Sequence, residues 1–61
     1  MKIITIIGIN NCILVVYYTS SACYQFAIIE PEGIIVEPGE IFASPEAALR
    51  EGKETIDAVW G

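Results

Sequence analysis

The chain has 61 residues, a net charge of −5 and an apolar fraction of 54%. A chain this short has room for one domain and buries only about 60% of the surface that its unfolded form exposes. The apolar fraction excludes a disordered chain, and the acidic balance disfavours nucleic acid and anionic membranes as partners. All eight carboxylates lie between Glu30 and Asp57, so a basic partner is favoured.

The start of the chain imitates a signal peptide, because Lys2 is followed by an apolar run. Asn10 and Asn11 interrupt that run, and its residues are mostly β-branched, which favours a strand. We therefore expect neither secretion nor membrane insertion, and a cytoplasmic location. Cys12 and Cys23 are then expected to be free thiols, although a disulfide between two chains stays open.

Three segments rich in β-branched and aromatic residues predict an antiparallel meander, with strands at residues 2–9, 12–19 and 22–29. Asn10-Asn11 suits a two-residue hairpin turn because asparagine tolerates positive φ. We expect Ser20-Ser21 to form the next reversal.

Two acidic Pro-Gly turns follow, at residues 30–33 and 37–40, and they flank a short strand at residues 34–36. Residues 41–43 are expected to complete an edge. Ser44 and Pro45 then predict the start of a helix over residues 45–59, because serine caps free amides and proline fits the first helical position.

The helix has one apolar face when its residues are placed at about 100° each. This face contains Ala48, Leu49, Gly52, Ile56, Val59 and Trp60. Gly52 costs about 1 kcal/mol in a helix interior, so we expect it to allow close packing on the sheet. The predicted fold is α+β: a three- to four-stranded antiparallel β-meander packed on one face by a C-terminal α-helix.

Two-residue turns fix a register in which Ile9 faces Cys12 and Thr19 faces Ala22. In this register both faces of the sheet are apolar, yet one helix covers only one of them. We therefore expect a homodimer or higher homo-oligomer and a protein partner. The expected interface residues, all on the second face, are Ile3, Ile7, Leu14, Val16, Tyr18, Gln25 and Ile29.

No catalytic, cofactor or metal site is predicted. The chain has no histidine, its two cysteines are isolated, and its glycines are too scattered to cradle a phosphate. Carboxylates on adjacent turns can coordinate calcium, but their spacing lacks the pattern of a calcium loop, so we interpret them as solvated. The acidic residues expected to meet a partner are Glu30, Glu32, Glu37, Glu40, Glu54 and Asp57.

The order of strand, acidic turn, short strand and capped helix in residues 24–60 resembles the partial RNase-H-like fold of HicB-type antitoxins. The stretches that carry the resemblance are Glu30-Pro31-Glu32-Gly33 and Ser44-Pro45-Glu46-Ala47-Ala48-Leu49. The resemblance covers about half of the chain and implies a small module that binds a protein and blocks it.

The functional prediction is a small acidic, non-enzymatic protein-interaction module that self-associates and binds or blocks a partner protein. The alternative is an acidic inhibitor or nucleic-acid mimic that occupies a basic groove of its target. An apolar interface should tolerate salt, whereas a mimic should lose affinity as ionic strength rises.

Overall fold

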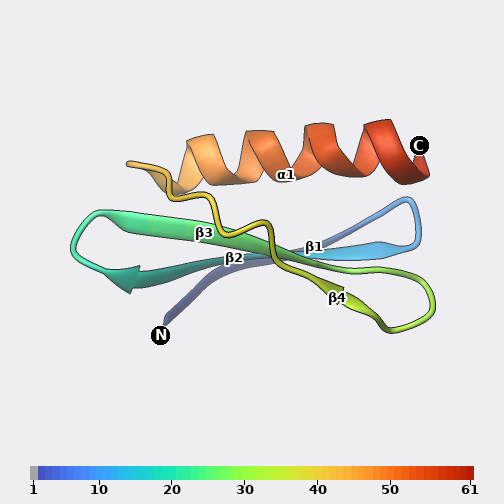
Figure 1. Ribbon diagram of the computed structural model, residues 1–61, viewed down its shortest axis with the longest axis horizontal. Coiled ribbons are helices and arrows are strands. Elements are labelled where there is room, and N and C mark those ends of the chain that lie inside the picture. Colours follow the sequence, from blue (N-terminus) through green and yellow to red (C-terminus); the bar gives the residue numbers. More distant parts are fainter. Residues whose placement is uncertain (1) are drawn as a thin grey trace.

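The computed structural model describes residues 2–61 and contains one antiparallel sheet with a helix across one of its faces (Figure 1). The sheet has the order β1-β2-β3-β4. Its strands are β1 (Lys2–Ile9), β2 (Cys12–Ser20), β3 (Cys23–Ile29) and β4 (Ile35–Val36), and the helix is α1 (Pro45–Trp60). The predicted α+β fold, a meander closed by a C-terminal helix, is confirmed.

The first hairpin turn is as predicted. Asn10 and Asn11 have φ values of 51° and 65°, and Ile9 pairs with Cys12. Positive φ at both central residues is the geometry of a type I′ turn, whose twist matches that of the strands. A bulge between Ile3 and Thr5 interrupts the β1–β2 register further on.

The second turn differs from the prediction. Ser20 pairs with Cys23, so the reversal falls at Ser21 and Ala22, with Ala22 at a φ of 55°. A bulge between Tyr18 and Ser20 then leaves Tyr18 opposite Tyr24. The predicted pairing of Thr19 with Ala22 is therefore wrong by one residue. Because successive side chains alternate between faces, this slip inverts β2 and β1 relative to β3.

Both ends of β3 are paired on the side away from β2. Ile28 and Ile29 pair with the two residues of β4, after a turn closed by the Gly33 amide, which donates to the Glu30 carbonyl oxygen at 2.8 Å. At the other end Tyr24 and Phe42 exchange backbone hydrogen bonds of 2.8 and 3.0 Å. The predicted edge segment at residues 41–43 is thus reduced to a single bridge.

The helix begins as the sequence predicts. The Ser44 hydroxyl accepts a hydrogen bond from the Ala47 amide at 3.2 Å, and Pro45 is the first helical residue. Ala48, Gly52 and Ile56 are buried. Val59, in the last turn of the helix, was predicted on the same face but is 63% exposed.

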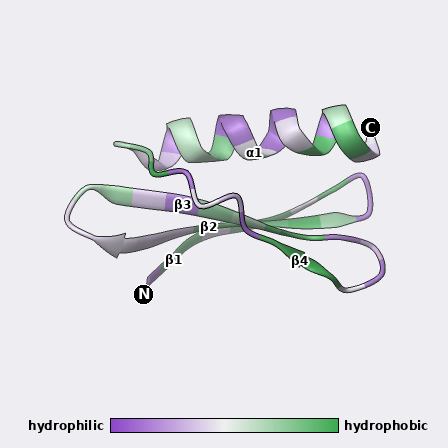
Figure 2. Ribbon diagram, in the orientation of Figure 1, coloured by the Kyte–Doolittle hydropathy of each residue, from purple (hydrophilic) through white to green (hydrophobic). Residues whose placement is uncertain are grey.

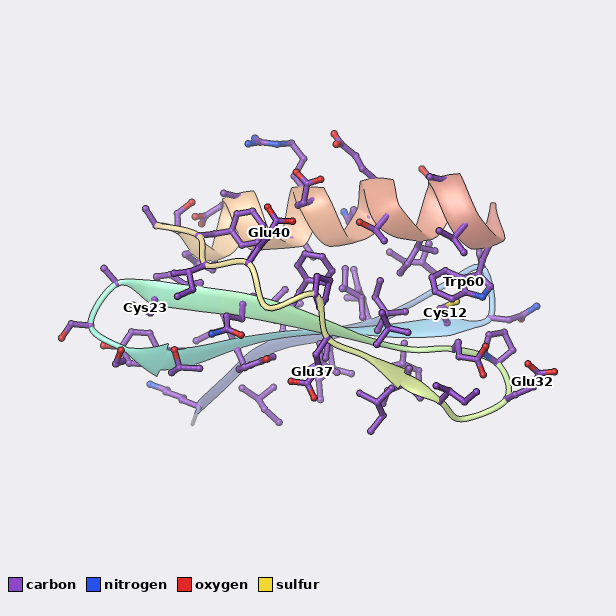
Figure 3. All side chains as sticks on the ribbon, viewed as in Figure 1. Cys12, Cys23, Glu32, Glu37, Glu40 and Trp60 are labelled. Carbon is purple, nitrogen blue, oxygen red and sulfur yellow. The ribbon has the colours of Figure 1, made fainter. Side chains whose placement is uncertain are left out.

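The core lies between α1 and the sheet. Its buried members are Cys12, Leu14, Val16, Phe26, Ile28, Ala48 and Ile56. Leu49 and Trp60 pack against this cluster from the helix, so their predicted place on its apolar face is confirmed. The ring of Trp60 reaches down toward the end of the sheet that carries Cys12 (Figure 3). Within residues 2–61, no helix is long and apolar enough to cross a membrane.

Candidate functional site: the open face of the sheet

The side of the sheet opposite α1 is uncovered, and we call it the open face. By strand register and burial it consists of Ile3, Ile6, Gly8, Ile13, Val15, Tyr17, Gln25, Ala27, Ile29, Ile35 and Glu37. Ile3, Ile6 and Ile35 are 51%, 58% and 60% exposed. Hydrophobic colouring runs along most of the sheet strands, whereas α1 alternates between polar and apolar residues (Figure 2). A lone antiparallel sheet normally presents polar side chains on this side.

A shallow hollow of about 200 Å³ lies on the open face. Its lining residues are Ile3, Val15, Tyr17, Ala27, Ile29, Ile35 and Glu37. They come from all four strands and the residue after β4, so the hollow depends on the assembled sheet. Six of the seven are apolar or aromatic, and the carboxylate of Glu37 supplies the one charge at its edge.

Tyr17 joins the apolar floor to that charge. It is only 7% exposed, and its hydroxyl shares its hydrogen between Glu37 Oε2 at 3.0 Å and Gln25 Oε1 at 3.2 Å. Figure 3 shows Glu37 on the side of the sheet away from α1. Burial raises the pKa of Tyr17, and the hydrogen bond and negative charge of Glu37 raise it further. The hydroxyl is therefore a fixed neutral donor, not a nucleophile.

The seven predicted interface residues divide between the two faces. Ile3, Gln25 and Ile29 lie on the open face, as expected. Leu14 and Val16 are fully buried beneath α1, and Ile7 packs against the same core. Placing these three on the second face was wrong.

Tyr18 also lies on the helix side, since it pairs with Tyr24, which packs against the core. The two rings are 5.3 Å apart. The physical reason for all four misplacements is the one-residue slip at the second turn. Val15 and Tyr17 are open-face residues that the sequence did not predict, for the same reason.

The six acidic residues do not form one cluster. Glu30 accepts hydrogen bonds from the amides of Glu32 and Ile34 at 3.1 and 3.3 Å, so it stabilises its own turn. Glu37 accepts from Tyr17, and Glu40 and Glu32 lie far apart on opposite parts of the fold (Figure 3). In the described part of the chain, no three acidic or cysteine side chains are placed to share a metal ion.

Glu54 and Asp57 lie on the outer side of α1 among basic residues. They line a second hollow, of about 260 Å³, together with Glu46, Leu49, Arg50 and Lys53. Asp57 Oδ1 also accepts a hydrogen bond of 3.3 Å from Asn10 at the tip of the first hairpin. The outer helix surface therefore carries charges of both signs.

Both cysteines are free, and they begin different strands at opposite ends of the sheet. Cys12 is 1% exposed and faces α1. Burial raises the pKa of the Cys12 thiol, and the nearby charge of Glu30 raises it further. A buried, protonated thiol is a poor nucleophile, so Cys12 acts as a small apolar core residue.

In comparisons with known proteins, no family model, curated protein or solved structure matches this chain.

Proposed function

We propose that this chain is a small, non-enzymatic interaction module that self-associates. It binds a partner protein through its open face. The observation that carries the proposal is the exposure of three isoleucines on that face, Ile3, Ile6 and Ile35. Contiguous apolar surface beyond a few hundred Å² on a small protein marks an interaction site. Covering this face would remove it from water at a gain of about 25 cal/mol per Å².

The hollow defines the chemistry of the partner segment. An apolar side chain fits against Val15 and Ala27, and a neighbouring lysine or arginine fits against Glu37 at the edge. A hydrogen bond or ion pair at such an edge contributes orientation more than affinity. The resemblance to HicB-type antitoxins supports a module that blocks the protein it binds. The two free thiols support a reducing compartment such as the cytoplasm.

An acidic mimic of nucleic acid remains the second candidate, supported by the net charge of −5. The structure offers it less than the sequence suggested, because Glu30 and Glu37 serve internal hydrogen bonds. Glu54 and Asp57 lie among cations on the helix.

The experiment compares Ile35→Glu with Ile41→Glu. The two isoleucines are 60% and 62% exposed, but only Ile35 lines the hollow on the open face. Each variant and the wild type is immobilised, and the proteins recovered from native lysate are quantified by mass spectrometry. We expect Ile35→Glu to lose the specific partner at least about tenfold and Ile41→Glu to retain it.

Equal recovery by both variants would refute the open face as the binding surface. Washing the wild-type complex at rising salt separates the two candidate functions. An apolar interface persists in high salt, whereas a nucleic-acid mimic releases its basic target.

A further inference from the structure

We propose that the self-association of this module occurs at the free edge of β1, which pairs antiparallel with β1 of a second copy. This inference deepens the proposed function by naming the self-associating surface. It leaves the open face for the partner protein.

Among residues 2–61, the outer edge of β1 is long and unpaired. β1 is the outermost strand of the sheet in this part of the chain, and β2 is its one neighbour there. Its sequence, KIITIIGI, has no proline and one charge, Lys2. Strand edges are normally shielded by charges, proline or short length, and an unshielded edge pairs with another strand.

The register shows which backbone groups are available. Ile9 and Cys12 flank the type I′ turn, so they form a hydrogen-bonded pair, and alternate residues along β1 point their N–H and C=O groups toward β2. Ile7 and Ile9 therefore face β2, whereas Ile6 and Gly8 face outward. The bulge between Ile3 and Thr5 ends the regular edge. The segment free to pair is residues 5–9.

A two-fold axis at the centre of this segment passes beside Ile7. Ile6 of each copy then lies opposite Gly8 of the other, and both outward-facing residues of each copy exchange hydrogen bonds. The exposed side chain of Ile6 would also cover Gly8 of the other copy. A Cβ atom added to Gly8 would have its nearest neighbouring atom 3.9 Å away. Nothing inside the fold explains a glycine here, since its φ is ordinary and the space is open.

The distribution of charge also favours the edge of β1 as the contact between two copies. Two copies carry −5 each, and they approach with least repulsion where carboxylates are absent. β1, β2 and β3 contain none. In addition, α1 packs chiefly over β2 and β3, so Ile7 and Ile9 are only half-buried. A second β1 strand would cover them.

The experiment uses disulfide trapping in a Cys12→Ala, Cys23→Ser background. Ile7→Cys places two sulfurs at the axis, where non-hydrogen-bonded Cα atoms are about 4.5 Å apart, within reach of a disulfide. Thr5→Cys is the matched control on the same strand and face, and its two copies would lie about 13 Å apart. We expect mild oxidation to convert most of the Ile7→Cys protein into a disulfide-linked dimer. Less than about a tenth of the Thr5→Cys protein should form such a dimer.

A second measurement needs no variant. Hydrogen exchange by NMR is recorded on the wild-type chain at rising concentration, with sedimentation equilibrium on the same samples. We expect the amides of Ile6 and Gly8 to slow at least about tenfold as the dimer forms. Those of Ile7 and Ile9, bonded to β2 in both states, serve as the internal control.

A dimer in which Ile6 and Gly8 exchange as fast as in the monomer would overturn the inference, as would equal linking of Thr5→Cys and Ile7→Cys. A chain that stays monomeric at millimolar concentration would overturn it too. None of these results depends on Ile35, so loss of the edge pairing and loss of the partner on the open face are distinguishable.

Discussion

At Gly52 the backbone of α1 lies close to the sheet. A Cβ atom added there would lie 2.5 Å from Leu14 Cδ1 and 3.3 Å from Leu14 Cγ. Leu14 is fully buried and has little room to move. The cost of glycine in a helix is therefore offset by the packing that it permits, as expected from the sequence.

Gly52→Ala should lower the free energy of unfolding by about 1 kcal/mol, because overpacking costs about 1–3 kcal/mol and the better helix former returns about 1. In a Leu14→Val background the crowding methyl groups are gone. The same substitution should there raise stability by up to about 1 kcal/mol. Urea unfolding of the four proteins measures this change of sign, and equal effects in both backgrounds would refute the contact.

Ionisation of Tyr17 should lower the free energy of unfolding at alkaline pH. Its pKa is raised above the ordinary value of 10.0 by burial and by Glu37, so the folded state holds this proton more tightly than the unfolded state. The stabilisation is present below pH 10 and is lost as pH rises through the raised pKa. We expect Glu37→Gln to move the phenolate titration of Tyr17 downward, as followed by ultraviolet absorbance. An unaltered titration would show that Glu37 does not act on Tyr17.

At the scale of elements, the second hairpin contains a strained residue that glycine would relieve. Ala22 has a φ of 55°, a conformation that costs a non-glycine residue about 1–2 kcal/mol. Ala22→Gly should stabilise the fold by about 0.5–1 kcal/mol after the added entropy of the unfolded chain is subtracted. Ser21→Gly, at the neighbouring position without positive φ, should not stabilise it. Thermal unfolding followed by circular dichroism compares the two variants.

The elements themselves could be predicted because each has a local cause. The Asn10-Asn11 turn, the Pro-Gly turns and the Ser44 cap depend on residues adjacent in the chain. The second turn could not be placed, since Ser20, Ser21 and Ala22 are all weak turn formers, and alanine is not expected at positive φ. Because of that single ambiguity, the face of β2 predicted to lie under the helix was the wrong one.

The hydrophobic pattern could not correct the error, because both faces of β1 and β2 are rich in isoleucine, leucine and valine. In an ordinary sheet a polar face would have shown which side is exposed. The apolar character of both faces therefore makes the open face a candidate site, and it also prevents the sequence from showing which residues form that face. Three of the seven expected interface residues are on it: Ile3, Gln25 and Ile29.

At the scale of the whole molecule, charge is segregated along the fold. The eight carboxylates lie after β3, while β1 has only Lys2. Repulsion between two such chains acts across their acidic parts and is screened by salt. Pairing through β1 should therefore strengthen as salt is added.

We expect the dimer dissociation constant to fall severalfold between low and physiological ionic strength, as measured by sedimentation equilibrium. Lys2→Ala is the matching control. If Lys2 attracts the other copy, its removal should weaken the dimer, and most strongly at low salt. A dissociation constant that rises with salt would instead indicate that opposite charges hold the copies together.

The bridge between Tyr24 and Phe42 has a consequence for how far assembly can proceed. A sheet that joins copies through a free edge can polymerise into a fibre if its other edge is also free. Here β4 offers only two residues, and beyond it the backbone of Phe42 already occupies the edge of β3 at Tyr24. Pro38 interrupts the strand direction between them. In the proposed β1 pairing, addition would therefore end after one step, in a closed pair whose growth is stopped by β4 and Phe42 at the other edge of the sheet.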